Sequence, residues 1–353
     1  MQLQSRLNPA FNTHRLLPGL LLTLGLSLSA LLLVQLPLPG ISTIGPLTLA
    51  MLLGIVAGHL GSDRVETLST EGLQFSRHYL LRAGIILYGL RISFDDLQSA
   101  GFNALLIDLV IVVGILATAA WVGIRWLKLD ARTAVLIGAG SAICGAAAVL
   151  ASAPTIRVRQ QAVPVAIATV VLFGSAAMLL YPWLFAQEWV QALFNHNGFH
   201  NGEIAFGRLV GATTHEVAQV TAVAATLPAD AAHTAVVTKL MRVMLLVPVL
   251  LVLSQLFGRD DAASDEPSKL PIPWFALVFM LLPLVNSLEL LPPQVLDLLH
   301  QLDQLCLAMA MAALGFATRI SAIRAAGWKP MALGALLFIL LLLGGTAMTL
   351  LLS

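Results

Sequence analysis

Two adjacent ionisable residues, His215 and Glu216, lie inside an apolar stretch that runs from residue 204 to residue 225. Inside a bilayer, an ionisable group costs about 3 kcal/mol and usually faces a polar cavity, a partner charge or an ion path. The stretch therefore predicts a transport site in which His215 and Glu216 carry the coupling ion. Candidate substrate ligands in the surrounding segment, Gly211-Ala-Thr-Thr-His-Glu-Val-Ala-Gln219, are Gly211, Thr213, Thr214 and Gln219.

A second segment with possible chemistry is Gly138-Ala-Gly-Ser-Ala-Ile-Cys-Gly145. Each glycine weakens a helix by about 1 kcal/mol relative to alanine, so this segment favours an interruption. An interruption lets backbone approach a ligand, and the first N–H groups of the following half-helix can hold an anion. The substrate-binding candidates here are Gly140, Ser141, Cys144 and Gly145. A close-packed helix crossing lined by small residues is an equal alternative.

Three further ionisable residues lie within or at the border of apolar segments. Asp108 is the third ion-coupling candidate, and it would either pair with a cation or be a buried, neutral carboxyl. Lys239 and Arg242 open a later segment and could supply positive potential to an anion. Both could equally extend to the membrane surface, which is the role expected of Arg242.

The composition indicates that membrane helices position these residues. Apolar residues make up 58% of the 353 residues and charged residues 10%, and the mean hydropathy is +0.90. Soluble domains carry about 25% charged residues. Because a span needs about 20 mostly apolar residues, the sequence predicts an all-α, multi-pass membrane protein with about eleven transmembrane helices. The predicted spans are residues 16–36, 44–60, 75–93, 102–124, 133–152, 162–186, 204–225, 234–257, 273–290, 302–318 and 329–352.

The same sequence argues against several classes of function. The net charge of +1 gives no basic surface for nucleic acid. Cys144 and Cys306 are too few for a disulfide framework. A His-Glu-x-x-His zinc motif fails because Gln219 stands where the second histidine is required, and no phosphate-binding loop of the Gly-x-x-x-x-Gly-Lys type occurs. We therefore expect no metal, no cofactor and no enzymatic activity.

The sequence predicts one membrane domain over residues 16–352, with a tail at 1–15 and a polar loop at 258–272. The first apolar run is too long for the core of a signal peptide and lacks a cleavage site, so we expect a retained helix. With the N-terminus in the cytoplasm, most Lys and Arg residues fall on the cytoplasmic side. Arg91, Arg157 and Arg159 fall on the outer side, and Arg82, Lys239 and Arg242 lie in or at spans.

An internal repeat is indicated by the segments Gly89–Gly101 and Gly315–Gly327. They have equal length, begin and end with glycine, and share apolar residues at matching places. The spans that they close are seven apart in the predicted order, so these spans should run in opposite directions. Many transporters are built from inverted repeats of this kind. Chance similarity between apolar segments is the alternative.

Three motifs carry a resemblance to a known family: residues 140–145 (Gly-Ser-Ala-Ile-Cys-Gly), 211–220 (Gly-Ala-Thr-Thr-His-Glu-Val-Ala-Gln-Val) and 308–315 (Ala-Met-Ala-Met-Ala-Ala-Leu-Gly). They resemble signatures of the YeiH-like bacterial inner-membrane family, whose members are commonly labelled sulfate exporters. That family is similar to the cation/proton antiporter and anion transporter group. The resemblance covers nearly the whole chain and implies inverted repeats whose two broken helices, here 138–145 and 211–219, cross near the midplane.

Residues and resemblance together predict a secondary transporter of the bacterial inner membrane. It would export a small anion, either sulfate or an organosulfur or carboxylate compound, by alternating access across the lipid bilayer. The expected coupling ion is a proton or sodium. A monovalent cation/proton antiporter that uses Asp108 and Glu216 is the first alternative, and a membrane regulatory protein without transport is the second. Assembly into a homo-oligomer is compatible with each.

Overall fold

A computed structural model describes residues 13–35, 45–61, 63–159, 161–196, 202–257, 274–288, 291–318 and 320–352. Every regular element in these ranges is a helix, which confirms the all-α fold class. Contacts divide the chain into two compact units, which are described separately. Unit 1 comprises residues 1–88 and 291–319, and unit 2 comprises residues 89–290 and 320–353.

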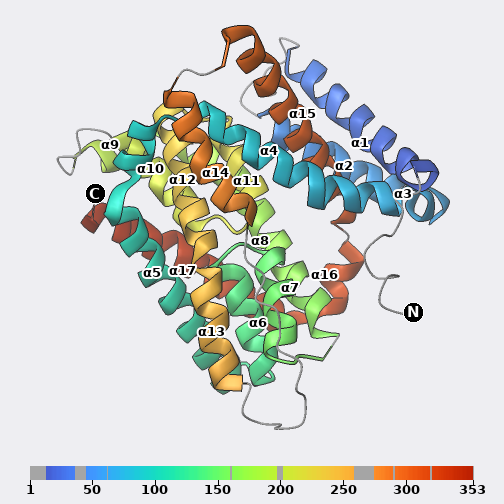
Figure 1. Cartoon of the computed structure of the whole chain (residues 1–353). Helices are drawn as coiled ribbons and strands as arrows, with labels where there is room; N and C mark the ends of the chain where they lie inside the picture. Colours follow the sequence, from blue (N-terminus) through green and yellow to red (C-terminus); the bar gives the residue numbers. More distant parts are fainter. Residues whose placement is uncertain are drawn as a thin grey trace, which may run out of the picture. The chain divides into compact units, whose positions relative to one another are not determined.

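Unit 1 combines the first helices of the chain with one long helix from its C-terminal part (Figure 1). Its elements are α1 (Thr13–Val34), α2 (Pro46–Leu60), α3 (Asp63–Phe75), the π-helix η1 (Ser76–Leu80), α4 (Leu81–Tyr88) and α15 (Pro293–Ala317). α15 packs on α2, α4 and η1, and α1 packs on α3. The hydroxyls of Thr23 and Ser76 share a buried hydrogen bond of 3.2 Å, which links two elements of this unit.

The contact between α2 and α15 depends on glycine. A Cβ atom on Gly54 would lie 2.2 Å from the carbonyl oxygen of Ala312, and one on Gly315 would lie 2.1 Å from that of Met51. Such distances leave no room for any side chain. Close backbone approach of this kind is typical of packed membrane helices, and it explains the small residues of the 308–315 motif.

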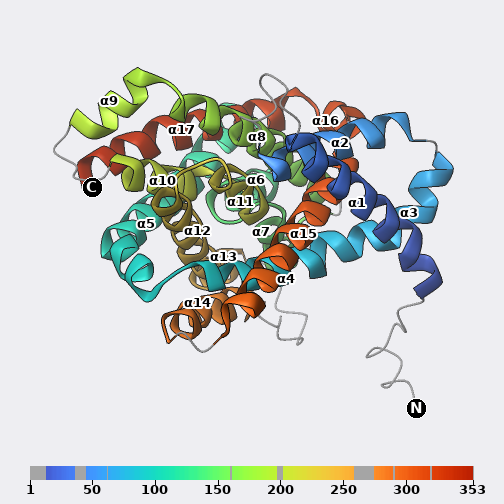
Figure 2. The ribbon, with the colours of Figure 1, turned by 90° about the horizontal axis from the view of Figure 1, so that it is seen from above.

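Unit 2 contains every predicted site residue and the remaining helices of the chain (Figure 2). Its elements are the 3-10 helix η2 (Gly89–Arg91), α5 (Phe94–Arg125), α6 (Ala131–Ala142), α7 (Ala146–Thr155), α8 (Ala162–Phe185), α9 (Glu188–His196), α10 (Gly202–Thr213), α11 (Val217–Ala224), α12 (Ala229–Met244), α13 (Leu246–Phe257), α14 (Trp274–Ser287), α16 (Ile320–Ala326) and α17 (Trp328–Leu352). α12 packs on α5, α10 and α11, and all eight residues of α11 are buried.

The predicted spans coincide with helical segments. Within the described residues, six segments are long and apolar enough to cross a membrane: 15–34, 104–125, 162–185, 229–257, 293–317 and 328–352. Shorter apolar helices cover 46–60, 146–155 and 277–287. The spans predicted at 133–152 and 204–225 are each divided into two helices of 8 to 12 residues. Each half is too short to cross alone, since a crossing takes about 20 residues.

Three statements about the organisation of the chain stay predictions. They are the cytoplasmic N-terminus, the single domain over 16–352 and the inverted repeat between Gly89–Gly101 and Gly315–Gly327. The polar loop predicted at 258–272 lies outside the described residues.

Candidate functional site

The first interruption lies in the glycine-rich segment. α6 ends at Ala142, residues 143–145 form a turn, and α7 begins at Ala146. The amide of Gly145 donates to the carbonyl of Gly140 at 3.0 Å and so closes the turn. Gly145 has a φ of +74°, in the left-handed region where glycine is favoured. The predicted interruption is confirmed, and Gly145 is the residue that permits it.

The second interruption comprises residues 214–216, between the end of α10 and the start of α11. Glu216 has an extended backbone, with φ −114° and ψ 149°. Its amide donates to Oε1 of Gln219 at 3.1 Å, so that the Gln219 side chain reaches back over the start of α11. The interruption predicted within 211–219 is therefore confirmed too.

The two interruptions meet in the interior of unit 2. Oε1 of Glu216 accepts a hydrogen bond of 3.1 Å from the amide of Ala146, the first residue of α7. The N-terminus of a helix carries partial positive charge, which stabilises a carboxylate. A Cβ atom on Gly145 would lie 2.3 Å from Cγ of Glu216. Gly145 thus also leaves the space that the Glu216 side chain fills.

The ammonium group of Lys239 also connects the two interruptions. Lys239 of α12 is fully buried, and its Nζ donates to the carbonyl of Ile143 at 2.7 Å and to that of Thr214 at 2.6 Å. These carbonyls follow α6 and α10. Because the C-terminus of a helix carries partial negative charge, the ammonium compensates both helix ends.

Arg242 lies one turn further along α12 and binds the same helix ends. Its guanidinium donates to three carbonyls, those of Ser141, Ala142 and Ala212. Arg242 is 0% exposed, so the expectation that it extends to the membrane surface is wrong. The physical reason is that a planar guanidinium with five N–H donors can serve several carbonyls at once, and these would otherwise be buried without a donor.

Asp108 of α5 is a third ionisable group in the interior of unit 2. It is fully buried, and neither carboxylate oxygen has a hydrogen-bond partner among the described residues. α5 packs on α12, and the charges of Arg242 and Lys239 act on Asp108. The carboxylate therefore lies within the electrostatic reach of two cations whose own hydrogen bonds go to backbone carbonyls.

The two threonine hydroxyls predicted to contact substrate are engaged within the protein. Thr213 Oγ1 donates to the carbonyl of Leu209 at 2.6 Å and lies 2.5 Å from the hydroxyl of Tyr181. Thr214 Oγ1 donates to the carbonyl of Val210 at 2.7 Å. Both threonines are fully buried. A substrate would reach these hydroxyls only after they leave these partners.

The remaining predicted substrate ligands are equally enclosed. Ser141 and Cys144 are buried at the end of α6 and in the turn after it. Gly211 lies against α12, since a Cβ atom there would be 2.3 Å from the carbonyl oxygen of Ala235. The structure thus brings the predicted residues together around the two interruptions, in a conformation that encloses them.

Two polar side chains, His215 of the second interruption and Gln219 of α11, each keep a polar atom without a hydrogen-bond partner among the described residues. His215 is 1% exposed, and its Nδ1 has no hydrogen-bond partner among the described residues. Its ring centroid lies 6.1 Å from that of Phe338 in α17. Nε2 of Gln219 is also without a partner there. The Gln219 amide packs on α8 at Gly174, where a Cβ atom would lie 2.1 Å from Oε1.

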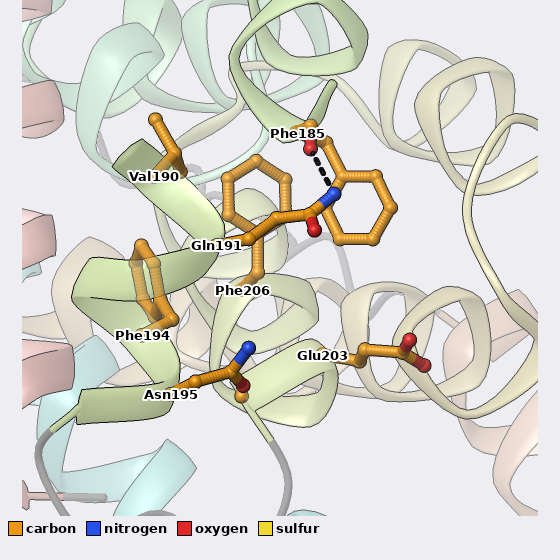
Figure 3. Close-up of a pocket in the computed structure, with 8 residues that line it drawn as sticks. Phe185, Val190, Gln191, Phe194, Asn195, Glu203 and Phe206 are labelled. Carbon is orange, nitrogen blue, oxygen red and sulfur yellow. Dashed lines mark hydrogen bonds between the residues drawn. The ribbon is translucent and has the colours of Figure 1, made fainter. Parts of the chain in front are cut away.

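A cavity of about 160 Å³ lies elsewhere in unit 2, between the end of α8, α9 and the start of α10 (Figure 3). Its wall includes Phe185, Phe194 and Phe206, and the ring centroids of the last two are 5.5 Å apart. Nε2 of Gln191 donates to the carbonyl of Phe185 at 2.9 Å. None of the predicted site residues lines this cavity, so it is separate from the interruptions.

Sequence reasoning missed the structural role of the α12 cations. Lys239 and Arg242 are three residues apart, a spacing that places two side chains on one helix face, and apolar residues surround them. That spacing indicates that the two cations share one helix face, but the same spacing is expected of a pair that reaches the membrane surface. Tyr181 and Gly174 were missed as well, because nothing local in α8 marks their contacts with Thr213 and Gln219.

Comparison with known proteins identifies the family. The sequence model of the family described as Conserved hypothetical protein 698 matches residues 18–334. A UPF0324 membrane protein of Pseudomonas aeruginosa is 44% identical over 346 residues, which are 97% of this chain and 96% of the relative. The UPF0324 inner membrane protein YeiH of Escherichia coli K12 is 40% identical over 337 residues, 94% of this chain and 93% of the relative.

No solved structure matches the chain. The matches cover nearly the whole sequence, including both interrupted segments, and the description of the relatives as membrane proteins agrees with the apolar spans. The chain therefore belongs to the Conserved hypothetical protein 698 family, the UPF0324 membrane proteins, among which are the YeiH proteins that its motifs resemble.

Proposed function

We propose that the protein is a secondary transporter of the bacterial inner membrane that exports a small anion by alternating access. The substrate class is sulfate or an organosulfur or carboxylate anion, and the N-terminus lies in the cytoplasm. The inner-membrane location follows the name of the YeiH relatives. The apolar spans suit a chain that crosses a bilayer several times.

One observation carries the proposal of an anion as substrate: the N-terminus of α7 already holds a carboxylate. Glu216 Oε1 accepts from the amide of Ala146, and Gly145 leaves the space for it. An oxyanion from solution has the same acceptor chemistry as this side chain. We infer that the substrate takes the place of Glu216 at this amide when the two interruptions separate.

Charge favours an anion over a cation at this site. Lys239 and Arg242 lie in the interior with the two interruptions, and both act on Asp108. A metal cation at Asp108 would be repelled by both, which makes the cation/proton antiporter the second candidate. The observation in favour of that candidate is that the Asp108 oxygens accept no hydrogen bond from the described residues.

Interrupted helices that meet in the interior are also the usual architecture of a transport site. In many secondary transporters, half-helix ends at the midplane bind substrate and coupling ion, and one bundle moves around that site. Interruptions are tolerated at such depth only where protein or a polar cavity satisfies the free backbone groups. Here Glu216, Lys239 and Arg242 supply those partners.

The experiment is a thermal-shift screen of the purified protein against sulfate, thiosulfate, a sulfonate and a short carboxylate, followed by counterflow of the hit in liposomes. An anion that stabilises the protein and exchanges across the liposome membrane supports the proposal. Proton movement that requires sodium or lithium, with no response to anions, would favour the antiporter. Silence in both assays would favour a regulatory protein without transport.

A further inference from the structure

The buried cations of α12 differ in how firmly they are held. Arg242 binds three carbonyls with a planar, rigid group. Lys239 binds two carbonyls with a compact charge at the end of a flexible four-carbon chain. Those two carbonyls belong to different interruptions. Lys239 is therefore the one movable side chain that directly ties residue 143 to residue 214 in the described part of unit 2.

Asp108 offers this ammonium a second partner. Its two oxygens are buried and accept no hydrogen bond from any described residue, while Lys239 and Arg242 both act on it electrostatically. An ionised carboxylate without donors is unfavourable in an apolar interior, whereas the protonated acid is neutral and tolerated. Loss of the proton would make a direct ion pair with the ammonium strongly favourable.

From this arrangement we propose that Lys239 couples proton binding to movement at the site, by exchanging the carbonyls of Ile143 and Thr214 for the carboxylate of Asp108. This inference rests on the proposed transport function. With a proton on Asp108, Lys239 holds both interruptions together. When the proton leaves Asp108 for water on the side to which the site opens, Lys239 pairs with Asp108 and releases both carbonyls. Lys239 stays an ammonium throughout.

Other titratable or charged groups interact with Lys239 or lie on helices packed around Asp108. Lys239 also interacts with Arg242, Cys144 and Glu216, and its charge acts on His215. Of the further helices packed on α5, α10 contributes Glu203 and Arg208, α6 only Arg132, α17 only Lys329, and α14 has no charged residue. Glu216, His215 and Cys144 are titratable groups beside Lys239, so the test isolates Asp108, whereas arginine stays charged and Glu203 is exposed at the start of α10.

The test is hydrogen exchange of the full-length protein in detergent or liposomes, followed by mass spectrometry of peptides covering 138–150 and 211–222. Rates are corrected for the intrinsic effect of pH. In the wild type, opening of both peptides should increase as the pH rises. Asp108→Asn, which imitates the protonated acid, should keep hydrogen exchange in both peptides slow at every pH. Lys239→Met should raise the exchange rate of both peptides roughly tenfold or more at every pH, because each peptide loses one hydrogen bond to a charged group.

The double variant Asp108→Asn/Lys239→Met gives the sharpest result. Because Asp108 acts through Lys239, the double variant should match Lys239→Met alone. The matched control is Asp303→Asn, which changes a buried acid of α15 in unit 1 and should keep the wild-type profile. A wild-type rise with pH that persists in Asp108→Asn would overturn the proposal. If Lys239→Met does not fold, the Asp108→Asn profile decides alone.

This test separates the inference from the function on which it rests. Exchange is measured without substrate, so a pH-dependent release at the interruptions can be present even if no anion binds. If anions bind and exchange across liposomes while the interruptions show no pH response, the role of Lys239 fails and the anion transporter stands. If the pH response is present but no anion binds, the transport proposal fails.

Discussion

The carboxylate of Glu216 accepts a hydrogen bond from the amide of Ala146, and these residues lie in different interrupted helices. The bond is 3.1 Å long and joins positions 70 residues apart in the sequence. It pairs the negative side chain of the second interruption with the positive helix end of the first. The two interruptions therefore form one electrostatic unit, and disturbing either should disturb the other.

Replacing Glu216 by glutamine tests the charge of this unit. The amide oxygen can still accept from Ala146, so the protein should fold, with a loss of about 1 kcal/mol from replacing a charged by a neutral hydrogen bond. If Glu216 carries the coupling proton, pH-driven transport should be suppressed while substrate exchange persists in part. Counterflow and proton-driven uptake in the same liposomes measure the two activities.

Glu203→Gln is the matched control for this variant, because Glu203 is an exposed acid at the start of α10, the helix that precedes the second interruption. It should retain both activities. An unchanged pH dependence in Glu216→Gln would remove Glu216 from the coupling mechanism and leave it only its structural bond to Ala146.

Gly145→Ala tests the space beside Glu216. Alanine at the Gly145 backbone angles, φ +74° and ψ −133°, costs roughly 1–3 kcal/mol, and its Cβ atom would lie 2.3 Å from Glu216 Cγ. We expect a lower melting temperature together with loss of the anion-induced thermal shift, because the turn that presents the Ala146 amide must move. Gly145→Val should be more severe in both measurements.

Gly114→Ala provides the control, since a Cβ atom on Gly114 of α5 would meet nothing within 4 Å. It should bind anions as the wild type does. Full anion binding by Gly145→Ala, accompanied only by reduced stability, would show that Gly145 serves packing and not the approach of a ligand.

Arg242→Met tests the helix-end cations. Removing the guanidinium leaves three carbonyls without their donor, and hydrogen bonds to charged groups are worth about 1.5–3 kcal/mol each. Such a loss is a large part of a typical stability of about 5–15 kcal/mol. We expect little folded protein by fluorescence-detected size exclusion, and partial recovery with Arg242→Lys, which retains the charge.

Arg125→Gln is the comparison for that variant. Arg125 is exposed in the last turn of α5, so its loss should cost less than about 1 kcal/mol. If Arg242→Met were as stable as Arg125→Gln, the carbonyls would have to find other donors, and the role assigned to Arg242 would be wrong.

Local composition was sufficient to predict the interruptions but not their partners. The glycines of 138–145 and the polar residues of 211–219 weaken a membrane helix by themselves, so the sequence places both interruptions closely. The donors that satisfy the freed carbonyls come from Lys239 and Arg242, about 100 residues after the first interruption. A long cationic side chain has the same local signature whether it reaches the membrane surface or the protein interior.

The same limit applies to the predicted ligands. Thr213 and Thr214 were chosen for their hydroxyls, and the sequence cannot reveal that Tyr181, Leu209 and Val210 engage these groups in the enclosed conformation. Apolar length predicted the six long apolar helices of the described residues, because the bilayer sets the length of a span. Side-chain partners depend on contacts between distant segments, which no local pattern records.

Gly315→Val tests the helix contact of unit 1. The Cβ atom would lie 2.1 Å from the carbonyl oxygen of Met51, a backbone atom that cannot rotate away, so α2 and α15 must move apart. Forcing extra volume into a packed contact costs about 1–3 kcal/mol or more.

Gly344→Val is the control, because a Cβ atom there meets only Leu340 Cδ1 at 3.8 Å, an ordinary contact. Melting of both variants in the same detergent should place Gly315→Val well below the wild type and Gly344→Val close to it. Equal melting temperatures would mean that the close approach of α2 and α15 is not needed for stability, and the explanation given for the small residues of 308–315 would have to be abandoned.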